Sequence, residues 1–131
     1  MNLYHLTVHK AAEMLNRREI KAQEVLEAVS RRIDLVENKI KAFITLTLDQ
    51  AEKKAKELDD RHEFTGLGGI PYGVQDNLCT LGVTTTCASK MLEGFIPPYD
   101  ATAVGRLKAA GAVMVGKLNM DEFGMGHFTE T

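Results

Sequence analysis

The sequence predicts an α/β protein in which N-terminal helices are followed by a partial, largely parallel sheet with a crossover helix. Two observations favour this fold class. Up to Arg61, apolar residues recur at spacings of three and four, as one face of a helix requires. Beyond Arg61 charged residues become sparse, and glycine and β-branched residues take their place. We therefore expect a helical segment with one strand at 1–61 and a partial α/β core at 62–131, together forming one compact unit.

The first two helices are predicted from their apolar stripes. Thr7 is placed to be the N-cap of the first helix, and the second helix is expected to begin at about Ala22. Both should turn their apolar side chains toward a common core. The residues expected to face inward are Val8, Ala11, Ala12 and Leu15 in the first helix, and Val25, Leu26, Val29, Ile33 and Val36 in the second.

A strand and a third helix complete this N-terminal segment. Residues 43–48 alternate in polarity and are rich in β-branched side chains, which is typical of a strand. Asp49 is expected to cap a charged helix over 50–60, whose lysines form a solvated face and not a binding patch. Its inward-facing residues should be Ala51, Ala55 and Leu58.

The C-terminal half contains the pattern of a crossover unit. Residues 70–74 predict a buried strand, and Asp100 is expected to cap a helix over 101–111 that ends at Gly111. A short apolar strand at 112–116 follows directly. A helix, a glycine and a buried strand in this order indicate a crossover in a parallel sheet. The remaining segments should be irregular or form at most a short strand or helix: 83–89, 95–99 and 117–131.

Composition and charge disfavour several classes of function. The formal net charge of -2 provides no basic field for phosphates, so no direct nucleic-acid binding is expected. No apolar run approaches the roughly 18 residues of a membrane span. The N-terminus, MNLYHLTVHK, lacks the pattern of a secretory signal, so a cytoplasmic protein without membrane contact is expected. Cys79 and Cys87 match no CxxC motif, so we expect half-buried apolar side chains and no metal, with a disulfide or a metal site as the open alternatives.

The stretch 70-IPYGVQDN-77 carries polar residues at the end of an apolar strand. Ligands of open α/β sheets bind outside the carboxyl ends of the strands, so Gln75, Asp76 and Asn77 are candidates for a site. The alternative is that Asp76 and Asn77 only make turn hydrogen bonds. The glycines before the strand do not follow the order of a phosphate-binding loop, so nucleotide binding is not indicated.

Longer motifs carry more information than this octapeptide. Core packing does not generate the combinations TTCASK at 85–90, PPYDAT at 97–102 and GKLNMDEF at 116–123. Together with Gly69-Ile70-Pro71 and Asp76-Asn77, they resemble the amidase signature family, and within it the A subunits of the glutamyl-tRNA(Gln)/aspartyl-tRNA(Asn) amidotransferases. The resemblance covers nearly the whole chain but only about the first third of a typical member. It implies a truncated amidase-signature fold.

The resemblance implies serine amidase chemistry. Such enzymes use a serine nucleophile that a deprotonated lysine activates through a second serine held in a cis peptide. In the amidotransferase, the A subunit releases ammonia from glutamine, and the B subunit uses it with ATP to amidate a glutamyl- or aspartyl-tRNA. The family's base lysine falls in the pattern G-I-P-x-x-x-K-D-N, which places it at Gln75. A carboxamide has no basic nitrogen, and loss of a general base costs a factor of about 10²–10⁴ in rate.

Further departures from the family concern its serines and its substrate face. The family's Gly-Ser-rich segment is not found before Thr131, and Ser30 and Ser89 are the only serines. Where the pattern has Gly-Ser-Ser-Thr-Glu-Asn, His127 and Phe128 replace hydroxyl residues and Thr131 replaces the asparagine. Histidine is a residue type that can serve as a substitute base, but the sequence identifies no nucleophile for His127 to serve. The substrate-face candidates are Asp76, Asn77, Met125, Gly126, His127 and Thr129.

We therefore expect a truncated, catalytically inactive relative of the A subunit that serves as a binding, assembly or regulatory module. Its partner would be a second copy, a complementary chain or the amidotransferase B or C subunits, because the shortened sheet leaves an open edge. The alternative is one part of a split amidase whose serine segment lies on another chain or on a continuation. No cofactor is expected, since the family's ATP site lies on the B subunit.

Overall fold

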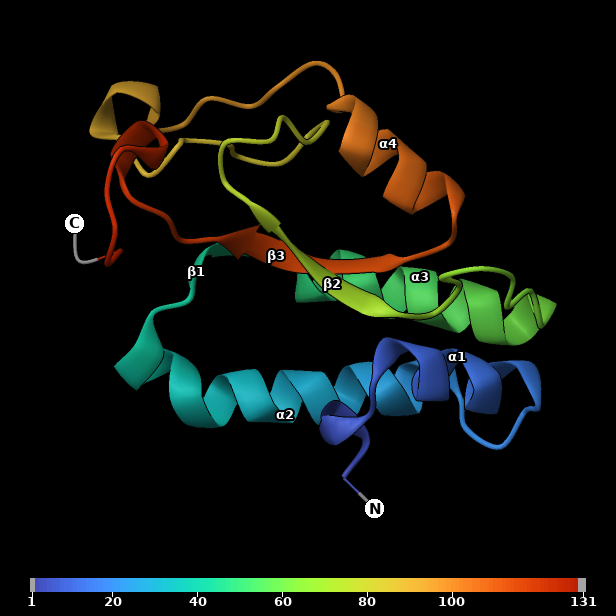
Figure 1. Ribbon diagram of the computed structural model, residues 1–131. Coiled ribbons are helices and arrows are strands. Elements are labelled where there is room, and N and C mark those ends of the chain that lie inside the picture. The colour runs from blue at the N-terminus through green and yellow to red at the C-terminus, as the bar shows by residue number, and fades with distance from the viewer. Residues whose placement is uncertain (1, 130–131) are drawn as a thin grey trace.

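The computed structural model describes residues 2–129 and has the expected α/β fold class. The segment up to Arg61 is mainly helical, and the strand that it contributes joins the same sheet as the two later strands (Figure 1). The elements, in chain order, are a 3₁₀ turn at Leu3–His5, α1 (Val8–Asn16), α2 (Ala22–Ile40), β1 (Phe43–Leu46), α3 (Leu48–Arg61), β2 (Pro71–Gln75), a 3₁₀ turn at Lys90–Leu92, α4 (Thr102–Ala109), β3 (Val113–Leu118) and a 3₁₀ turn at Glu122–Gly124.

The sheet is mixed and has the strand order β1-β3-β2. β2 and β3 are parallel and are connected through α4, which confirms the predicted crossover unit. β1 pairs antiparallel with the other side of β3. In the β2–β3 register, Tyr72 lies opposite Met114 and Gly73 lies opposite Gly116, so that Val115 is an extra residue in β3. After such a bulge, the side chains point to the opposite face of the sheet from the one that strict alternation would give them.

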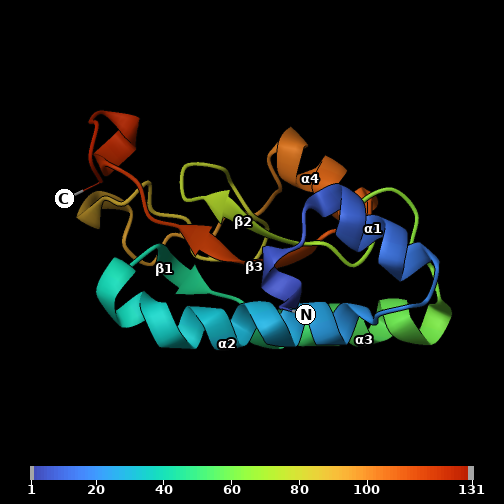
Figure 2. The same ribbon diagram turned by 60° about the horizontal axis from the view of Figure 1, so that its bottom comes forward.

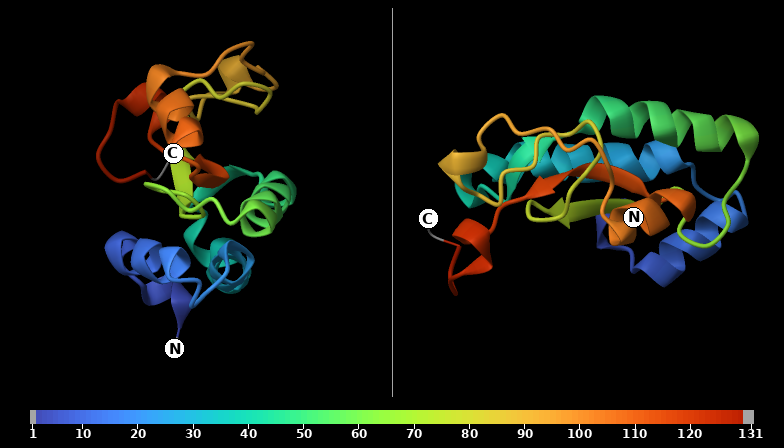
Figure 3. Two further views of the ribbon diagram at one scale, coloured as in Figure 1. Left: turned by 90° about the vertical axis from the view of Figure 1, so that its right-hand side faces the viewer. Right: turned by 90° about the horizontal axis from the view of Figure 1, so that it is seen from above.

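Helices cover the sheet on both faces. α4 lies on the opposite side of β2 and β3 from α1 and α2 (Figures 1 and 3). α2 and α3 run beside each other along the sheet, as Figure 2 and the view from above in Figure 3 show. A hydrophobic core lies between these N-terminal helices and the sheet. Its members include Ala11, Leu15, Val25, Leu26, Ile33, Ala51, Ala55, Leu58, Ile70, Val113 and Val115.

The start of α1 is as predicted, but two other predicted caps are wrong. The side chain of Thr7 accepts a hydrogen bond from the backbone N–H of Lys10, as an N-cap does. Asp49, in contrast, lies inside the first turn of α3, which begins at Leu48. Asp100 precedes the N-cap position of α4, and its carboxylate binds the Leu81 N–H and the Lys108 ammonium. The carboxylate of Asp100 therefore binds residues that are distant in sequence, and it does not cap α4 as its position next to the helix predicted.

The strands also differ in extent from the prediction. β1 ends at Leu46, because Thr47 turns the chain into α3 and donates its hydroxyl to the carbonyl of Met114. β2 is an edge strand among residues 2–129, and only Val74 within it is fully buried. β3 continues to Leu118, so Lys117 belongs to a strand and not to the loop predicted from residue 117 onward. Gly111 follows α4 with a φ of +78°, consistent with its predicted role in ending the helix.

Candidate functional site

The carboxyl end of β2 presents three polar side chains that point in different directions. Gln75 and Asn77 are exposed, whereas Asp76 between them is fully buried. A turn follows, in which the N–H of Leu78 donates to the carbonyl of Gln75. The side chain of Asp76 makes no turn hydrogen bond. It bonds a loop ten residues further along the chain instead.

Asp76 connects β2 to the loop at 83–89. Its Oδ2 accepts hydrogen bonds from the backbone N–H of Thr86 at 2.8 Å and from the Thr86 hydroxyl at 2.6 Å. Its backbone carbonyl accepts from the N–H of Cys87, and its own N–H donates to the carbonyl of Leu118 on β3. One aspartate therefore holds the strand end, the loop and the neighbouring strand together.

Lys117 approaches the same point from β3. Its side chain is fully buried, and its Nζ donates to the carbonyl of Leu78 and to the hydroxyl of Thr85, each at 2.7 Å. The same nitrogen lies 3.6 Å from Oδ1 of Asp76, an oxygen that accepts no hydrogen bond within residues 2–129. The result is a buried ion pair beneath the exposed end of β2.

The charges at this site are arranged to support structure. Burial lowers the pKa of the Lys117 ammonium, and the adjacent Asp76 carboxylate opposes that shift. Buried ion pairs contribute little net stability, because desolvation offsets the attraction, but removing one partner is costly. The pair therefore fixes the geometry of the β2 end and offers no accessible group to a ligand.

The second group of sequence-predicted residues lies beyond β3. The segment from Met125 to Thr129 is exposed and folds back on Asp121, whose Oδ1 accepts a hydrogen bond from the N–H of Thr129. Gly126 packs so closely on Asp121 that a Cβ there would lie 2.5 Å from its carboxyl carbon. His127 is exposed beside Phe128, with 6.3 Å between the ring centroids. Thr131 lies outside the described residues.

Cys87 links the two groups of candidates through its backbone. Its N–H donates to Asp76 and its carbonyl accepts from Phe123, so the loop at 83–89 lies between the β2 end and the C-terminal turn. Cys87 and Ala88 both have positive φ values, of 52° and 55°. Consecutive non-glycine residues in this conformation store strain, which is common near functional sites. The structure thus brings the two groups to the same end of the sheet.

The remaining candidates do not assemble into a nucleophilic or metal site. The hydroxyl of Ser89 is buried and donates to the carboxylate of Glu122 at 2.7 Å, so its hydrogen is directed to that acid and not to His127. Cys79 and Cys87 are free and half-buried, and burial is the main factor that raises the pKa of the Cys87 thiol. Within residues 2–129, no group of three or more His, Cys, Asp or Glu side chains is placed to hold a metal ion.

Sequence reasoning missed Lys117. A signal was available, because a lysine stands within an apolar run at 112–118 while an aspartate follows the preceding strand. Neighbouring parallel strands end at the same edge, so opposite charges at these two positions are placed to pair. The predicted strand ended at residue 116, which left Lys117 in the following loop.

The fold and the site define an α/β domain in which a buried ion pair supports the end of an edge strand. The protein-family model for Amidase matches residues 24–131. The chain belongs to the amidase family.

Individual relatives give a closer assignment. The chain is 52% identical over 134 residues to the A subunit of the glutamyl-tRNA(Gln) amidotransferase of Moorella thermoacetica, covering 99% of this chain and 28% of that protein. It is also 52% identical to the corresponding protein of Geotalea daltonii, covering 100% of this chain and 28% of that protein. The sequence therefore corresponds to the N-terminal region of these relatives and spans little more than a quarter of their length.

Solved structures show the same fold. A chain from a vestigial protein complex that reveals the evolutionary origins of an s-triazine catabolic enzyme superposes with a TM-score of 0.84 at 35% identity, covering 90% of this chain and 27% of that one. The peptide amidase of Stenotrophomonas maltophilia superposes with a TM-score of 0.83 at 33% identity, covering 92% of this chain and 26% of that one. No helix within residues 2–129 is long and apolar enough to cross a membrane.

Proposed function

We propose that this chain is a catalytically inactive relative of the amidotransferase A subunit, with a role as a binding or assembly module. One observation carries the proposal. The exposed end of β2, where the family resemblance implies a base lysine, presents the carboxamide of Gln75. This group cannot accept the proton of a serine hydroxyl at neutral pH.

Among residues 2–129, no group near Gln75 compensates for the carboxamide. Lys117 is fully buried, and its ammonium is held by two hydrogen bonds and by Asp76. A general base must reach the reacting proton directly or through one water molecule. Lys117 is enclosed and cannot do so, whereas His127 is exposed on a separate segment.

The exposed apolar side chains of the loops that follow β2 and β3 support a binding role. Six large apolar residues of the loops that follow β2 and β3 are more than half exposed: Leu81, Met91, Ile96, Tyr99, Met125 and Phe128. Contiguous exposed apolar surface and unpaired strand edges are typical of association sites. The partner would be a second copy of the chain, a complementary chain, or the B or C subunit of an amidotransferase in the cytoplasm.

Ammonia release from glutamine tests the inactive assignment. The purified chain, alone and with any co-purifying protein, should release no more ammonia than buffer. Gln75→Ala and His127→Ala serve as matched variants. Glutamine hydrolysis that disappears in either variant would refute the proposal and favour a split enzyme.

Size-exclusion chromatography with light scattering tests the binding role, together with a pull-down against the B and C subunits. We expect a mass above the 14.5 kDa of one chain, or micromolar capture of either of those two proteins. A monomer of 14.5 kDa that captures neither of them contradicts the binding role.

A further inference from the structure

The open edge of β2 presents backbone groups at regular intervals. Within residues 2–129, β2 pairs with β3 on one side and is the last strand of the sheet on the other. The carbonyl of Ile70 and the N–H of Asp76 both bond β3, one just before β2 and one just after it. Backbone groups alternate in direction along a strand, so the even-numbered residues bond β3 throughout. Pro71, Gly73 and Gln75 therefore direct their backbone groups to the open edge.

These three residues do not all offer both a donor and an acceptor. Proline has no backbone N–H, so Pro71 offers only its carbonyl. The carbonyl of Gln75 accepts a hydrogen bond from the N–H of Leu78 in the following turn, so Gln75 offers only its N–H. Gly73 offers both groups. In chain order, the edge thus presents an acceptor, a donor, an acceptor and a donor.

This order of groups is complementary to itself. When two copies of β2 run antiparallel about a two-fold axis at Gly73, the two glycines donate to each other's carbonyl. The N–H of Gln75 then meets the carbonyl of the partner's Pro71. The donor that Pro71 lacks falls opposite the carbonyl of the partner's Gln75, which Leu78 already occupies. In this register all four available groups of each edge are paired.

The side chains of β2 also suit a second copy. In the same register, Tyr72 lies opposite the partner's Val74, and aromatic and β-branched side chains stabilise a sheet when they are paired across strands. Gly73 places no side chain at the two-fold axis. Residues 69–75 include no charged side chain, so two copies of this segment meet without repulsion between like charges.

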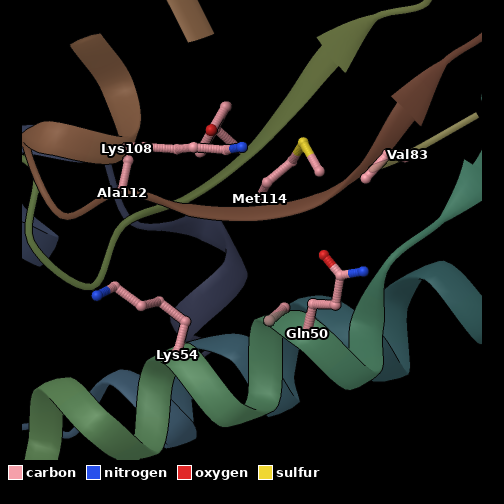
Figure 4. Close-up of a pocket in the computed structure, with 8 residues that line it drawn as sticks. Gln50, Lys54, Val83, Lys108, Ala112 and Met114 are labelled. Carbon is pink, nitrogen blue, oxygen red and sulfur yellow. The ribbon is translucent and has the colours of Figure 1, made fainter. Parts of the chain in front are cut away.

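An apolar groove of about 250 Å³ lies beside this edge. Residues 70–73 form one side of the groove, and its other members include Leu3 and Val8. Within the described residues 2–129, no charged side chain lines it. In contrast, Lys54 and Lys108 line the cavity between α3, β3 and the end of α4 (Figure 4). A strand added beside β2 would remove apolar surface of the groove from water, which stabilises association.

The open edge of β1 is less suited to pairing. Its register with β3 shifts between Phe43 and Thr45, so β1 contains a bulge. Bulges are among the features that protect a strand edge from further pairing. In addition, the N–H of Phe43 already donates to the carboxylate of Glu37, at 2.8 Å. The regular edge at β2 is therefore the one that a second copy fits.

We propose that β2 is the interface of a symmetric homodimer. The β2 strands of two copies pair antiparallel at Gly73 and join two three-stranded sheets into one continuous sheet. This inference rests on the binding role proposed above and assigns its partner as a second copy of the chain. The contacts at Gln75 involve its backbone N–H, so they do not depend on the chemistry of its side chain.

Amide hydrogen exchange followed by NMR locates the interface. The N–H groups of Gly73 and Gln75 should exchange more slowly as protein concentration rises, because the dimer provides their acceptors. The N–H of Leu46 is the control. It lies on the open edge of β1, since its neighbour Thr47 bonds β3. Its exchange should not change with protein concentration.

Two substitutions at one position separate backbone effects from side-chain effects. Gln75→Pro removes an N–H that does not bond β3, and edge strands accept proline at such a position. The dimer then lacks two hydrogen bonds, so sedimentation equilibrium should show dimerisation weakened about 5–150-fold. Gln75→Ala keeps the N–H, and its effect should stay within about twofold. Circular dichroism checks that both variants fold, and exchange in the parent protein decides the question if Gln75→Pro does not.

Four results would overturn the assignment. A mass of 14.5 kDa up to millimolar concentration excludes the homodimer, although capture of a B or C subunit would still support the binding role. Protection of Leu46 in place of Gly73 and Gln75 would place the interface at β1. Equal dimerisation of Gln75→Pro and Gln75→Ala would show that the backbone of β2 is not paired. Protection of Gly73 by a different, complementary chain, without dimerisation, would give the edge another occupant.

Discussion

The buried pair of Lys117 and Asp76 provides the sharpest test of how this structure holds the end of β2. In Lys117→Met the methionine retains most of the volume of the lysine stem but removes the ammonium. The Asp76 carboxylate then remains buried without a counter-charge, because its Oδ1 has Lys117 as its neighbour at 3.6 Å and accepts no hydrogen bond within residues 2–129. The carbonyl of Leu78 and the hydroxyl of Thr85 lose their donor as well.

The expected magnitude follows from these contacts. Two hydrogen bonds from a charged donor, at about 1.5–3 kcal/mol each, suggest a loss of about 3–6 kcal/mol. Breaking a buried ion pair by removing one partner costs about 3–5 kcal/mol, which agrees. We expect Lys117→Met to lower the free energy of unfolding by about 3–5 kcal/mol. This is a large part of the roughly 5–15 kcal/mol that a domain has in total.

Urea denaturation followed by circular dichroism measures this loss. The matched control is Arg31→Met, because Arg31 and Glu27 form an exposed pair within α2, with side-chain exposures of 73% and 61%. Its cost should be about 0.5 kcal/mol or less. If Lys117→Met is partly unfolded in water, an osmolyte such as TMAO restores a measurable baseline for all variants.

A double-mutant cycle separates the ion pair from simple packing. Asp76→Asn in the Lys117→Met background should cost less than it does alone, with a coupling energy of about 0.5–3 kcal/mol. Our interpretation fails if Lys117→Met shifts the urea midpoint no more than Arg31→Met does. It fails equally if the two substitutions add without coupling.

Three further predictions concern other contacts. Tyr72→Phe should leave the free energy of unfolding unchanged or raise it by up to about 1 kcal/mol, since it removes a buried hydroxyl without a partner. The raised pKa of Tyr72 means that the folded state favours the neutral phenol. The folding stability linked to this preference is fully present below pH 10.0 and is lost as pH rises through the folded-state pKa. Ultraviolet titration of tyrosinate and urea midpoints, compared between the parent and Tyr72→Phe, should both diverge above that pH. Gly116→Ala should lower the free energy of unfolding, measured by urea denaturation, by about 2 kcal/mol or more, because its Cβ would lie 2.5 Å from the carbonyl oxygen of Thr45. Gly105→Ala in α4, where a Cβ meets nothing within 4 Å, should raise it by about 0.5–1 kcal/mol, and equal effects at the two glycines would contradict the structure. Thr7→Ala should cost about 1 kcal/mol through loss of the α1 cap, whereas Thr7→Ser should be nearly neutral.

The sequence by itself determined the helices and the family. Local periodicity reveals α1, α2 and α3, because each is long enough for an apolar stripe to repeat over several turns. The connection from α4 to β3 can also be predicted locally, because a helical segment, Gly111 and an apolar strand follow one another directly in the sequence. The long motifs identify the family, and Gln75 can be recognised from the sequence as a departure from it.

Only the tertiary structure decided which polar groups are buried and with which partners. Strict alternation would place Val113, Val115 and Lys117 on one face of β3. The extra residue at Val115 reverses that facing, so Lys117 reaches Asp76 while the two valines remain in the helical core. A bulge depends on pairing between strands that are distant in sequence, so it cannot be predicted from the local pattern of polar and apolar residues. The same limit explains Asp100, whose carboxylate binds Leu81 and Lys108 in place of a helix end.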